Sequence, residues 1–276
     1  MMTTTLRPAE PLQQHPDGTR SRRYQVCVNS RPVGEIRLGT SPTLGDTVGR
    51  IDELTIADGD RRRGRGTVAA LAAEEVARGW GCRQIETVVP AAAADGALRL
   101  FDALGYTLRN RGMTKRLGTA PPALPPEIRE RPMTEAEFTH WRARERERYT
   151  RNWSERGVPE TVARAKAHDD QARLLPHGLA TEGMLLSVLE RAGTLVGTLW
   201  LALREDRAYV YDVETVAAER GRGYGRALML LAERQALASG RPLLGLNVFA
   251  GNTPAERLYE SLGYETVTYS LSKPLL

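Results

Sequence analysis

Apolar and polar positions alternate in short runs along the first half of the chain, a pattern that is typical of strands. Residues 29–32 separate two such runs and predict the turn of a hairpin. Two longer stretches have helical spacing, and Gly79 ends the first, alanine-rich one. The predicted strands are 22–29, 33–39, 50–57, 84–89 and 106–117, and the predicted helices are 67–78 and 95–104.

The second half repeats this order and has two additional helices near its start. Thr134 is followed three residues later by Glu137, which predicts a capping box at the start of the first helix, and Pro159 starts the second. The predicted helices are 134–151, 159–174, 223–238 and 253–262. The predicted strands are 127–131, 184–190, 194–203, 208–216 and 243–249, with a last strand ending at Leu271.

A motif of the form R-x-x-G-x-G occurs twice, at Arg61–Gly66 and Arg220–Gly225, each time between a predicted strand and a predicted helix. Each copy is followed at nearly the same distance by the triplet Leu-Gly-Tyr, at 104–106 and at 262–264. A single glycine-rich turn is weak evidence, because glycines also mark ordinary loops. Two copies with matching spacing predict a duplicated domain.

The boundary between the copies falls in a proline-rich stretch. Residues 119–126 contain four prolines and predict an extended linker, which places one domain at 1–118 and the other at 127–276. A chain of 276 residues has room for two domains of common size. A hydrophobic content of 41% and a charged content of 26% are typical of folded domains.

The composition excludes some classes of protein. No apolar run approaches the roughly 20 residues that cross a bilayer, and the first residues lack the hydrophobic region of a signal peptide, so a cytoplasmic location is expected. Two distant cysteines and four histidines without helical pairing indicate neither a disulfide nor a metal site. The net charge of +5 comes almost entirely from arginine, and we interpret it as a compositional bias that permits acidic or phosphate-bearing partners without requiring them.

The repeated motif suggests a phosphate-binding turn. The first N–H groups of a helix have no intrahelical partner, and glycines before them allow a diphosphate to approach closely. Residues 220–226 would form such a turn. No G-K-[ST] follows, and the spacing differs from G-x-G-x-x-G, so neither a Walker loop nor a Rossmann turn is predicted.

The second copy resembles the GNAT acyltransferase superfamily, whose signature is a strand, [RQ]-x-x-G-x-[GA] and a helix. The resemblance rests on Thr215–Leu228 and on the later element Asn252–Tyr264. It implies an α+β fold with two tandem GNAT-like domains, each a mixed, mostly antiparallel twisted sheet flanked by helices. The first domain lacks the two helices that usually help to form the acceptor pocket. The resemblance also implies acetyl-CoA as cosubstrate.

By resemblance, the backbone of the second domain would hold acetyl-CoA, with the pantetheine arm paired like an added strand and the diphosphate at the glycine-rich turn. Asn252 would steady the CoA arm, and Tyr259 would protonate the departing thiolate. Glu214 or Asp212, which alternation places on one face of a strand, would accept the proton of the acceptor amine, with a water chain as the alternative. The expected cofactor-binding residues are Val216, Ala217, Ala218, Gly221, Arg222, Gly223, Tyr224, Gly225, Arg226 and Asn252.

The first copy departs from the family pattern. Phe101 stands where the second copy has Tyr259, and Ala94 stands where it has Asn252. A phenyl ring has no proton to donate, so we expect this domain to be a degenerate scaffold that either binds CoA or does not. Its candidate cofactor-binding residues are Ile56, Arg62, Gly64 and Gly66.

The function expected from this resemblance is transfer of an acetyl group from acetyl-CoA to a primary amine of a small molecule or protein in the second domain. The alternatives are a CoA-ester-binding or sensing module without turnover and, less favoured, a nucleic-acid-binding protein. Two similar units are compatible with an internal pseudo-dimer or a homodimer, and no membrane partner is expected. The acceptor site is expected to draw on the added helices and the residues after them, and its arginines hint at a carboxylate or phosphate on the acceptor. The candidate residues are Arg142, Arg146, Tyr149, Trp153 and His177.

Overall fold

The computed structural model describes residues 4–155 and 158–275. Contacts between backbone segments divide the chain into two compact units. The first unit takes the chain up to Arg111 and again from Val267 onward, and the second takes Gly112–Thr266. The proline-rich segment predicted as a linker has no helix or strand over residues 117–127 and belongs to the second unit.

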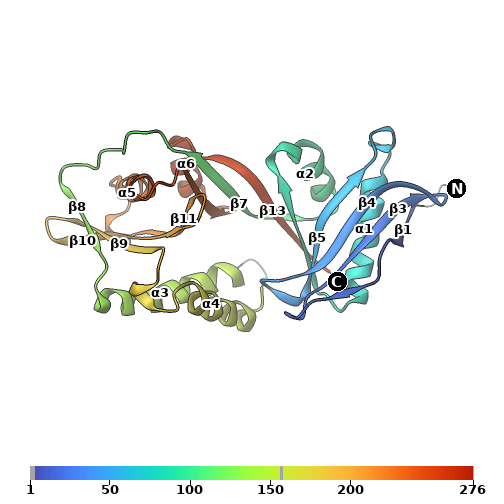
Figure 1. Ribbon diagram of the computed structural model, residues 1–276, viewed down its shortest axis with the longest axis horizontal. Helices are drawn as coiled ribbons and strands as arrows, with labels where there is room; N and C mark the ends of the chain where they lie inside the picture. Colours follow the sequence, from blue (N-terminus) through green and yellow to red (C-terminus); the bar gives the residue numbers. More distant parts are fainter. Residues whose placement is uncertain (1–3, 156–157, 276) are drawn as a thin grey trace. The chain divides into compact units, whose positions relative to one another are not determined.

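The first unit is a sheet covered by two helices (Figure 1). Its strands lie in the order β1-β3-β4-β5-β6-β13, with β2 beside β3. Only β5 and β6 run parallel in this unit, and the other described pairs are antiparallel. The hairpin turn between β3 and β4 places Asn29 and Ser30 at positive φ, as a tight turn requires. The strands are β1 (Thr4–Pro8), β2 (Gln13–Gln14), β3 (Arg20–Val28), β4 (Arg31–Ser41), β5 (Gly45–Ile56), β6 (Gln84–Pro90) and β13 (Glu265–Pro274), and the helices are α1 (Arg65–Gly79) and α2 (Ala94–Ala103).

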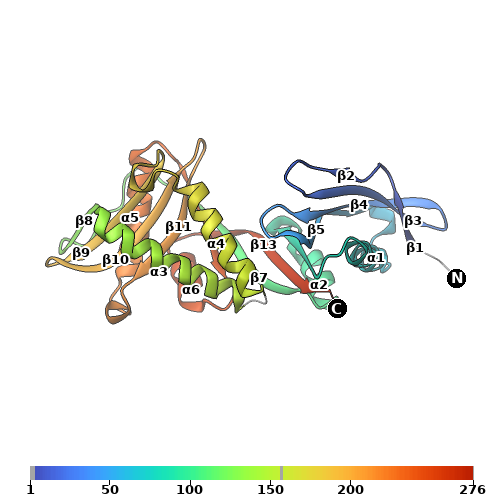
Figure 2. The same cartoon turned by 90° about the horizontal axis from the view of Figure 1, so that it is seen from below.

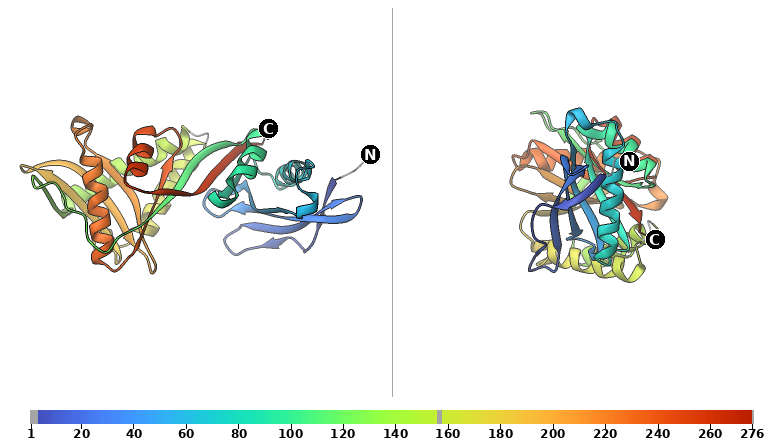
Figure 3. Two further views of the ribbon diagram at one scale, coloured as in Figure 1. Left: turned by 90° about the horizontal axis from the view of Figure 1, so that it is seen from above. Right: turned by 90° about the vertical axis from the view of Figure 1, so that its right-hand side faces the viewer.

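The second unit has the order β7-β12-β11-β10-β9-β8. Figure 1 shows α3 and α4 on one face of this sheet and α5 and α6 on the other. Figure 2 shows α3 and α4 side by side, and the left view of Figure 3 shows α5 lying across the strands of the opposite face. The strands are β7 (Thr107–Arg116), β8 (Ile128–Pro132), β9 (Met184–Arg191), β10 (Thr194–Leu203), β11 (Ala208–Thr215) and β12 (Leu243–Phe249), and the helices are α3 (Glu135–Ser154), α4 (Glu160–Leu174), α5 (Tyr224–Ala238) and α6 (Thr253–Ser261).

Local sequence signals explain the helices that position the site. The predicted capping box of α3 is present, because the Thr134 hydroxyl accepts a hydrogen bond from the Glu137 N–H and the Glu137 carboxylate accepts one from the Thr134 N–H. Along α5, buried residues recur at helical spacing against the sheet, as at Leu228 and Leu231. The helices and the central strands therefore follow the pattern read from the sequence.

The last strand of each half does not close the half that the sequence pattern assigns it to. Residues 268–274 of β13 lie antiparallel to β6, with Thr268 opposite Pro90 and Pro274 opposite Gln84. Residues 112–116 of β7 belong to the second unit, where the next residue, Leu117, donates its N–H to the Pro242 carbonyl at 2.8 Å. Each unit is therefore completed by a strand from the other half of the sequence.

The short strands β1 and β2 were not predicted, since their residues lack a run of alternating apolar positions. None of the helices in the described part of the chain is long and apolar enough to cross a membrane.

Candidate active site

The second R-x-x-G-x-G copy forms an open turn at the start of α5. Gly221 and Gly223 have φ values of 78° and 86°, in the left-handed region that favours glycine. A Cβ built on either glycine would meet no atom within 4 Å, and residues 220–223 are exposed. The turn therefore presents the free N–H groups of the α5 N-terminus to solvent, where an anion can reach them.

The first copy has the same backbone. Gly64 precedes α1 with a φ of 73°, as Gly223 precedes α5. Arg62 takes the place of Gly221 and still adopts a positive φ of 56°. Because an arginine rarely adopts this conformation, the fold imposes it.

The last glycine of the motif has a packing role that the sequence analysis did not anticipate. A Cβ on Gly225 would lie 3.2 Å from Cδ2 of Leu258 on α6, and a Cβ on Gly66 would lie 2.9 Å from Cδ1 of Leu100 on α2. This glycine therefore permits a close approach of two helices in each unit rather than the approach of a ligand.

Three side chains of the turn have contacts with other residues of the protein. Tyr224 is 6% exposed and belongs to the core. Arg222 pairs with Glu219 at 3.1 Å, and Arg226 donates to the Ser261 hydroxyl at 2.6 Å.

The sheet of the second unit opens beside this turn. β11 and β12 pair in parallel from Ala208 opposite Leu244 to Val210 opposite Leu246, and no pairing continues along the rest of the two described strands. β11 nevertheless runs on to Thr215 and β12 to Phe249. The strand ends therefore part, which leaves backbone groups of β11 without a neighbouring strand on that edge. β5 and β6 part in the same way after Ile51.

The backbone groups at this edge are not those that the sequence analysis named. The Val216 N–H is bonded to the Val196 carbonyl of β10 at 3.0 Å and so does not face the opening, and Ala217 and Ala218 form a short 3-10 turn. Because successive strand residues direct their backbone groups to opposite edges, the groups that face the opening are those of Val213 and Thr215. If the end of β11 had been known, counting alternate residues back from Val216 would have identified Val213 and Thr215.

Tyr259 and Asn252 lie on α6, which follows β12. Asn252 is the N-cap of α6, and its Oδ1 accepts a hydrogen bond from the Ala255 N–H at 3.4 Å. Tyr259 is 6% exposed, and no described residue is hydrogen-bonded to its hydroxyl. Burial, and then the nearby Asp212 carboxylate, raise the pKa of Tyr259 to about 12. The hydroxyl therefore keeps its proton at neutral pH and lies within the field of Asp212.

Two carboxylates of β11 share one guanidinium. Arg148 on α3 pairs with Asp212 at 2.5 Å and with Glu214 at 2.9 Å, and the Trp141 Nε1–H donates to Asp212 at 3.3 Å. Burial alone would lower the pKa of Arg148, but the two carboxylates outweigh it and raise that pKa. The prediction that Asp212 and Glu214 lie on one face of the strand is confirmed by these shared contacts. Arg148 was missed, because in a run of alternating charges it resembles a solvated surface residue.

A third carboxyl, Glu145, lies on the buried side of α3. It is 9% exposed and accepts a hydrogen bond from the Gln171 side chain on α4 at 3.2 Å. Burial, and then the Asp212 carboxylate, raise the pKa of Glu145 to about 7. Its position on the inner face of α3 was not predicted, although its spacing of four residues from Trp141 is the signal that could have placed it there.

The residues suggested for the acceptor site do not form one cluster. Tyr149 donates to Asp170 at 3.1 Å, and the Trp153 ring lies edge-on to Phe249 at 5.9 Å. His177 is exposed at the start of a short 3-10 turn.

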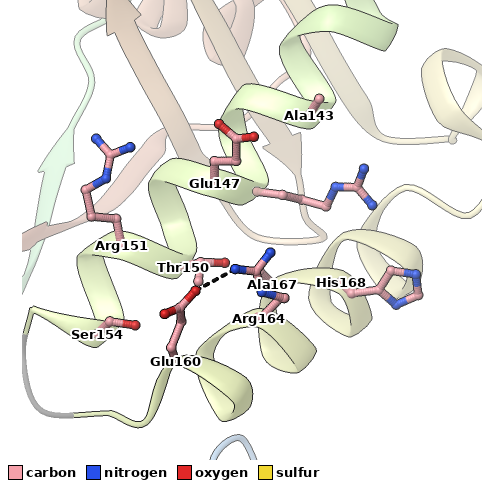
Figure 4. Close-up of a pocket in the computed structure, with 10 residues that line it drawn as sticks. Ala143, Glu147, Thr150, Arg151, Ser154, Glu160, Arg164, Ala167 and His168 are labelled. Carbon is pink, nitrogen blue, oxygen red and sulfur yellow. Dashed lines mark hydrogen bonds and ion pairs between the residues drawn. The ribbon is translucent and has the colours of Figure 1, made fainter.

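Arg146 lines a groove of about 740 Å³ between α3 and α4, where Glu160 and Arg164 form an ion pair. Figure 4 shows this groove, with Glu147 and Arg151 on the α3 side. Arg142 and Arg146 also line a smaller groove beside it. None of the residues that line the two grooves belongs to the glycine turn or to β11.

In the first unit, where β5 and β6 part, the strand-edge carbonyl of Ile56 and nearby charged side chains are bonded to other residues of the same unit. Arg61 donates from Nε to the Ile56 carbonyl at 2.8 Å, at the position that corresponds to Thr215. Asp60 is 6% exposed and pairs with Arg31 at 2.9 Å and with Arg65. Phe101 is buried against Tyr106, with ring centroids 4.9 Å apart, and Ala94 begins α2 without an amide side chain.

These features define a tandem-domain acetyltransferase fold. The chain belongs to the acetyltransferase (GNAT) family, whose model matches residues 3–106 and 135–264. The match in two segments agrees with the duplication read from the repeated motif.

Similar proteins include a mycothiol acetyltransferase of Thermomonospora curvata, 30% identical over 250 residues that cover 89% of this chain and 79% of that protein. An uncharacterized N-acetyltransferase of Bacillus subtilis, YycN, is 33% identical over 107 residues, which cover 37% of this chain and 69% of that protein. A GCN5-related N-acetyltransferase from Sphaerobacter thermophilus has a similar structure, with a TM-score of 0.57 and 21% identity over 92% of this chain and 80% of that chain.

Proposed function

We propose that the second unit is an acetyl-CoA-dependent N-acetyltransferase that acts on a primary amine, and that the first unit is a structural partner without turnover. The observation that carries the proposal is the combination found in the second unit. An open glycine turn lies next to parted strands, with a buried tyrosine hydroxyl and two carboxylates at the opening.

The residues present fit acetyl-CoA. The exposed amides that begin α5 would hold the diphosphate, and the backbone of Val213 and Thr215 would pair with the pantetheine arm. Acetyl-CoA supplies an activated thioester, which the acceptor amine attacks directly. Asn252 stands at the start of α6 and would border the arm.

The side chains divide the proton transfers between them. Glu214, with Asp212 beside it, would take the proton of the acceptor ammonium, either directly or through water, so that the neutral amine is available. Tyr259 would give its proton to the departing thiolate and would be reprotonated from solvent. Its raised pKa keeps the hydroxyl protonated over the whole working range.

The first unit lacks these elements. Phe101 replaces the tyrosine, and Arg61 occupies the Ile56 carbonyl at the strand edge. These contacts support a structural role for the first unit. Its chain continues into β7, whose residues 112–116 belong to the second unit.

The test is an unbiased screen of amines with acetyl-CoA, in which thiol release and the mass of the acetylated product are measured. Acetylation of at least one amine is expected. Binding of acetyl-CoA without thiol release from any amine would favour a sensing module instead.

A further inference from the structure

The face of the second sheet beneath α3 carries an excess of negative charge. α3 contributes Glu145 and Arg148, and β11 contributes Asp212 and Glu214. One guanidinium therefore serves three carboxyl groups, in a chain whose net charge is +5. Arg148 is already in contact with two of them, so its charge is shared before any acceptor arrives.

The neighbouring charges do not cancel this excess. Arg146 lies close enough to lower the pKa of Glu145 slightly, but its side chain lines the grooves between α3 and α4. Asp170 on α4 is already paired with Lys166 at 2.6 Å and with Arg173 at 2.9 Å. Burial and Asp212 outweigh the nearby arginines, so the pKa of Glu145 rises to about 7.

A separate observation indicates an unsatisfied hydrogen-bonding group at the same place. Thr198 on β10 is opposite Glu214 in the strand register, and Trp200 is opposite Asp212. Trp141 on α3 contacts both Trp200 and Asp212, so this face is the one that α3 covers. Because paired residues of antiparallel strands share a face, the Thr198 side chain lies on it as well.

Thr198 is 4% exposed, and its hydroxyl has no hydrogen-bond partner among the described residues. Buried hydroxyls are normally paired, so an unpaired one beside a carboxylate is a place for a ligand donor. An ammonium group has three donors, and Asp212, Glu214 and Thr198 offer three acceptors.

We infer that the acceptor site selects amines that bring additional positive charge, of the diamine or polyamine class, and that Glu145 is the residue that sets this preference. This inference rests on the proposed function. One ammonium group would be held at Asp212, Glu214 and Thr198, where the reaction takes place. A second cationic group would be attracted to Glu145 and would compensate the charge that Arg148 leaves unbalanced. An acceptor with a carboxylate would be repelled, in contrast to the anionic acceptor suggested by the arginines of the added helices.

The experiment compares three acceptors of matched length at pH 8: 1,6-diaminohexane, hexylamine and 6-aminohexanoate. Two quantities are measured for each, acetyl-CoA-dependent thiol release and the shift in melting temperature of the full chain on adding the amine. The variants are Glu145→Gln and, as the matched control, Glu147→Gln. Glu147 lies on the same helix but on the groove that Figure 4 shows.

We expect kcat/KM for the diamine to exceed that for 6-aminohexanoate by about tenfold or more. The carboxylates of the site attract the second ammonium group of the diamine and repel the carboxylate of 6-aminohexanoate at short range. Glu145→Gln should reduce this ratio about tenfold and should abolish the extra thermal stabilisation by the diamine. Glu147→Gln should leave both unchanged. If Glu145→Gln does not fold, Asp212→Asn should remove the thermal stabilisation by the diamine in the same way.

The inference is overturned if 6-aminohexanoate stabilises or reacts as well as the diamine, or if Glu145→Gln and Glu147→Gln behave alike. Thermal stabilisation by the diamine without thiol release from any of the three amines would instead overturn acetyl transfer to this class of amine and leave the charge preference of the site standing.

Discussion

Lys273 on β13 donates a hydrogen bond to Glu74 on α1 at 2.8 Å, across 199 positions of sequence. Lys115 on β7 makes the same contact with Glu233 on α5, at 2.7 Å. Both glutamates are almost fully buried. Each exchanged strand therefore carries a lysine that neutralises a buried carboxylate in the unit that it completes.

Lys115→Met should destabilise the second unit strongly. The side chain of Glu233 is 6% exposed, and loss of its cation leaves a buried charge unpaired, which costs about 3 kcal/mol or more in the free energy of unfolding. The measurement is urea unfolding followed by tryptophan fluorescence. The control is Arg164→Met, which breaks an ion pair with Glu160 that is exposed on both sides and should cost less than about 1 kcal/mol.

The double variant Lys115→Met/Glu233→Leu distinguishes the charge from the packing. Replacing both partners removes the unpaired carboxylate, so much of the lost stability should return. Equal destabilisation by Lys115→Met and Arg164→Met would contradict this account of the exchanged strand.

What the sequence could predict depended on how local the signal was. The α3 capping box needs only Thr134 and Glu137, three residues apart, and it was predicted correctly. The pairing of β13 with β6 was not predictable, because the duplication gives both sheets similar edges and both closing strands the same alternation. Patterns of apolar positions specify a strand but not which of two equivalent edges it joins.

The candidate site shows the same limit. The glycine turn and Tyr259 were identified from the motif, and Gly225 of the turn lies close to Leu258 of the helix that carries Tyr259. The edge groups of Val213 and Thr215 were missed, because a shift of one residue at the end of β11 changes which amides face the gap. Arg148 and Glu145 were missed because only the packing of α3 on the sheet distinguishes them from the exposed charges beside them.

Glu145→Gln should change how stability depends on pH. The pKa of Glu145 rises from 4.5 to about 7 in the folded chain, because of burial and Asp212, with Arg148 and Arg146 opposing the rise. The folded state thus holds the proton more tightly than the unfolded state, and stability falls as pH rises from about 4.5 to about 7.

Above that range the ionised carboxyl costs on the order of 3 kcal/mol, which the glutamine variant avoids. The variant should therefore melt higher than the wild type at pH 8 and at nearly the same temperature at pH 4.5. Thermal unfolding at several pH values measures the difference, and a gap that does not vary between pH 4.5 and 8 would show that Glu145 is not buried as an ionisable group.

Gly223→Asp and Gly64→Asp form a matched pair that tests the division of labour between the units. Both glycines have positive φ, so either change costs about 1–2 kcal/mol of stability. Only Gly223→Asp places a carboxylate at the turn proposed to hold the diphosphate. We expect it to weaken acetyl-CoA binding about 100-fold or more and to abolish turnover, through charge repulsion at short range.

Calorimetric titration and thiol release measure the two effects. The wild type should bind one acetyl-CoA per chain, and Gly64→Asp should keep both that stoichiometry and its turnover. Loss of turnover in Gly64→Asp, in a chain that is still folded at the assay temperature, would assign a catalytic role to the first unit.

Tyr259→Phe should lower kcat about 100-fold, which is the usual loss when a general acid is removed. Binding of acetyl-CoA should be unchanged, because the ring stays in the core and no described residue is hydrogen-bonded to its hydroxyl. Since the pKa of Tyr259 is raised to about 12, kcat of the wild type should show no loss of a general acid between pH 7 and pH 10. Steady-state rates over that range, with Phe101→Tyr as the control in the first unit, separate the alternatives. A kcat within about twofold of the wild type would leave Tyr259 as a core residue and give the proton transfer to solvent.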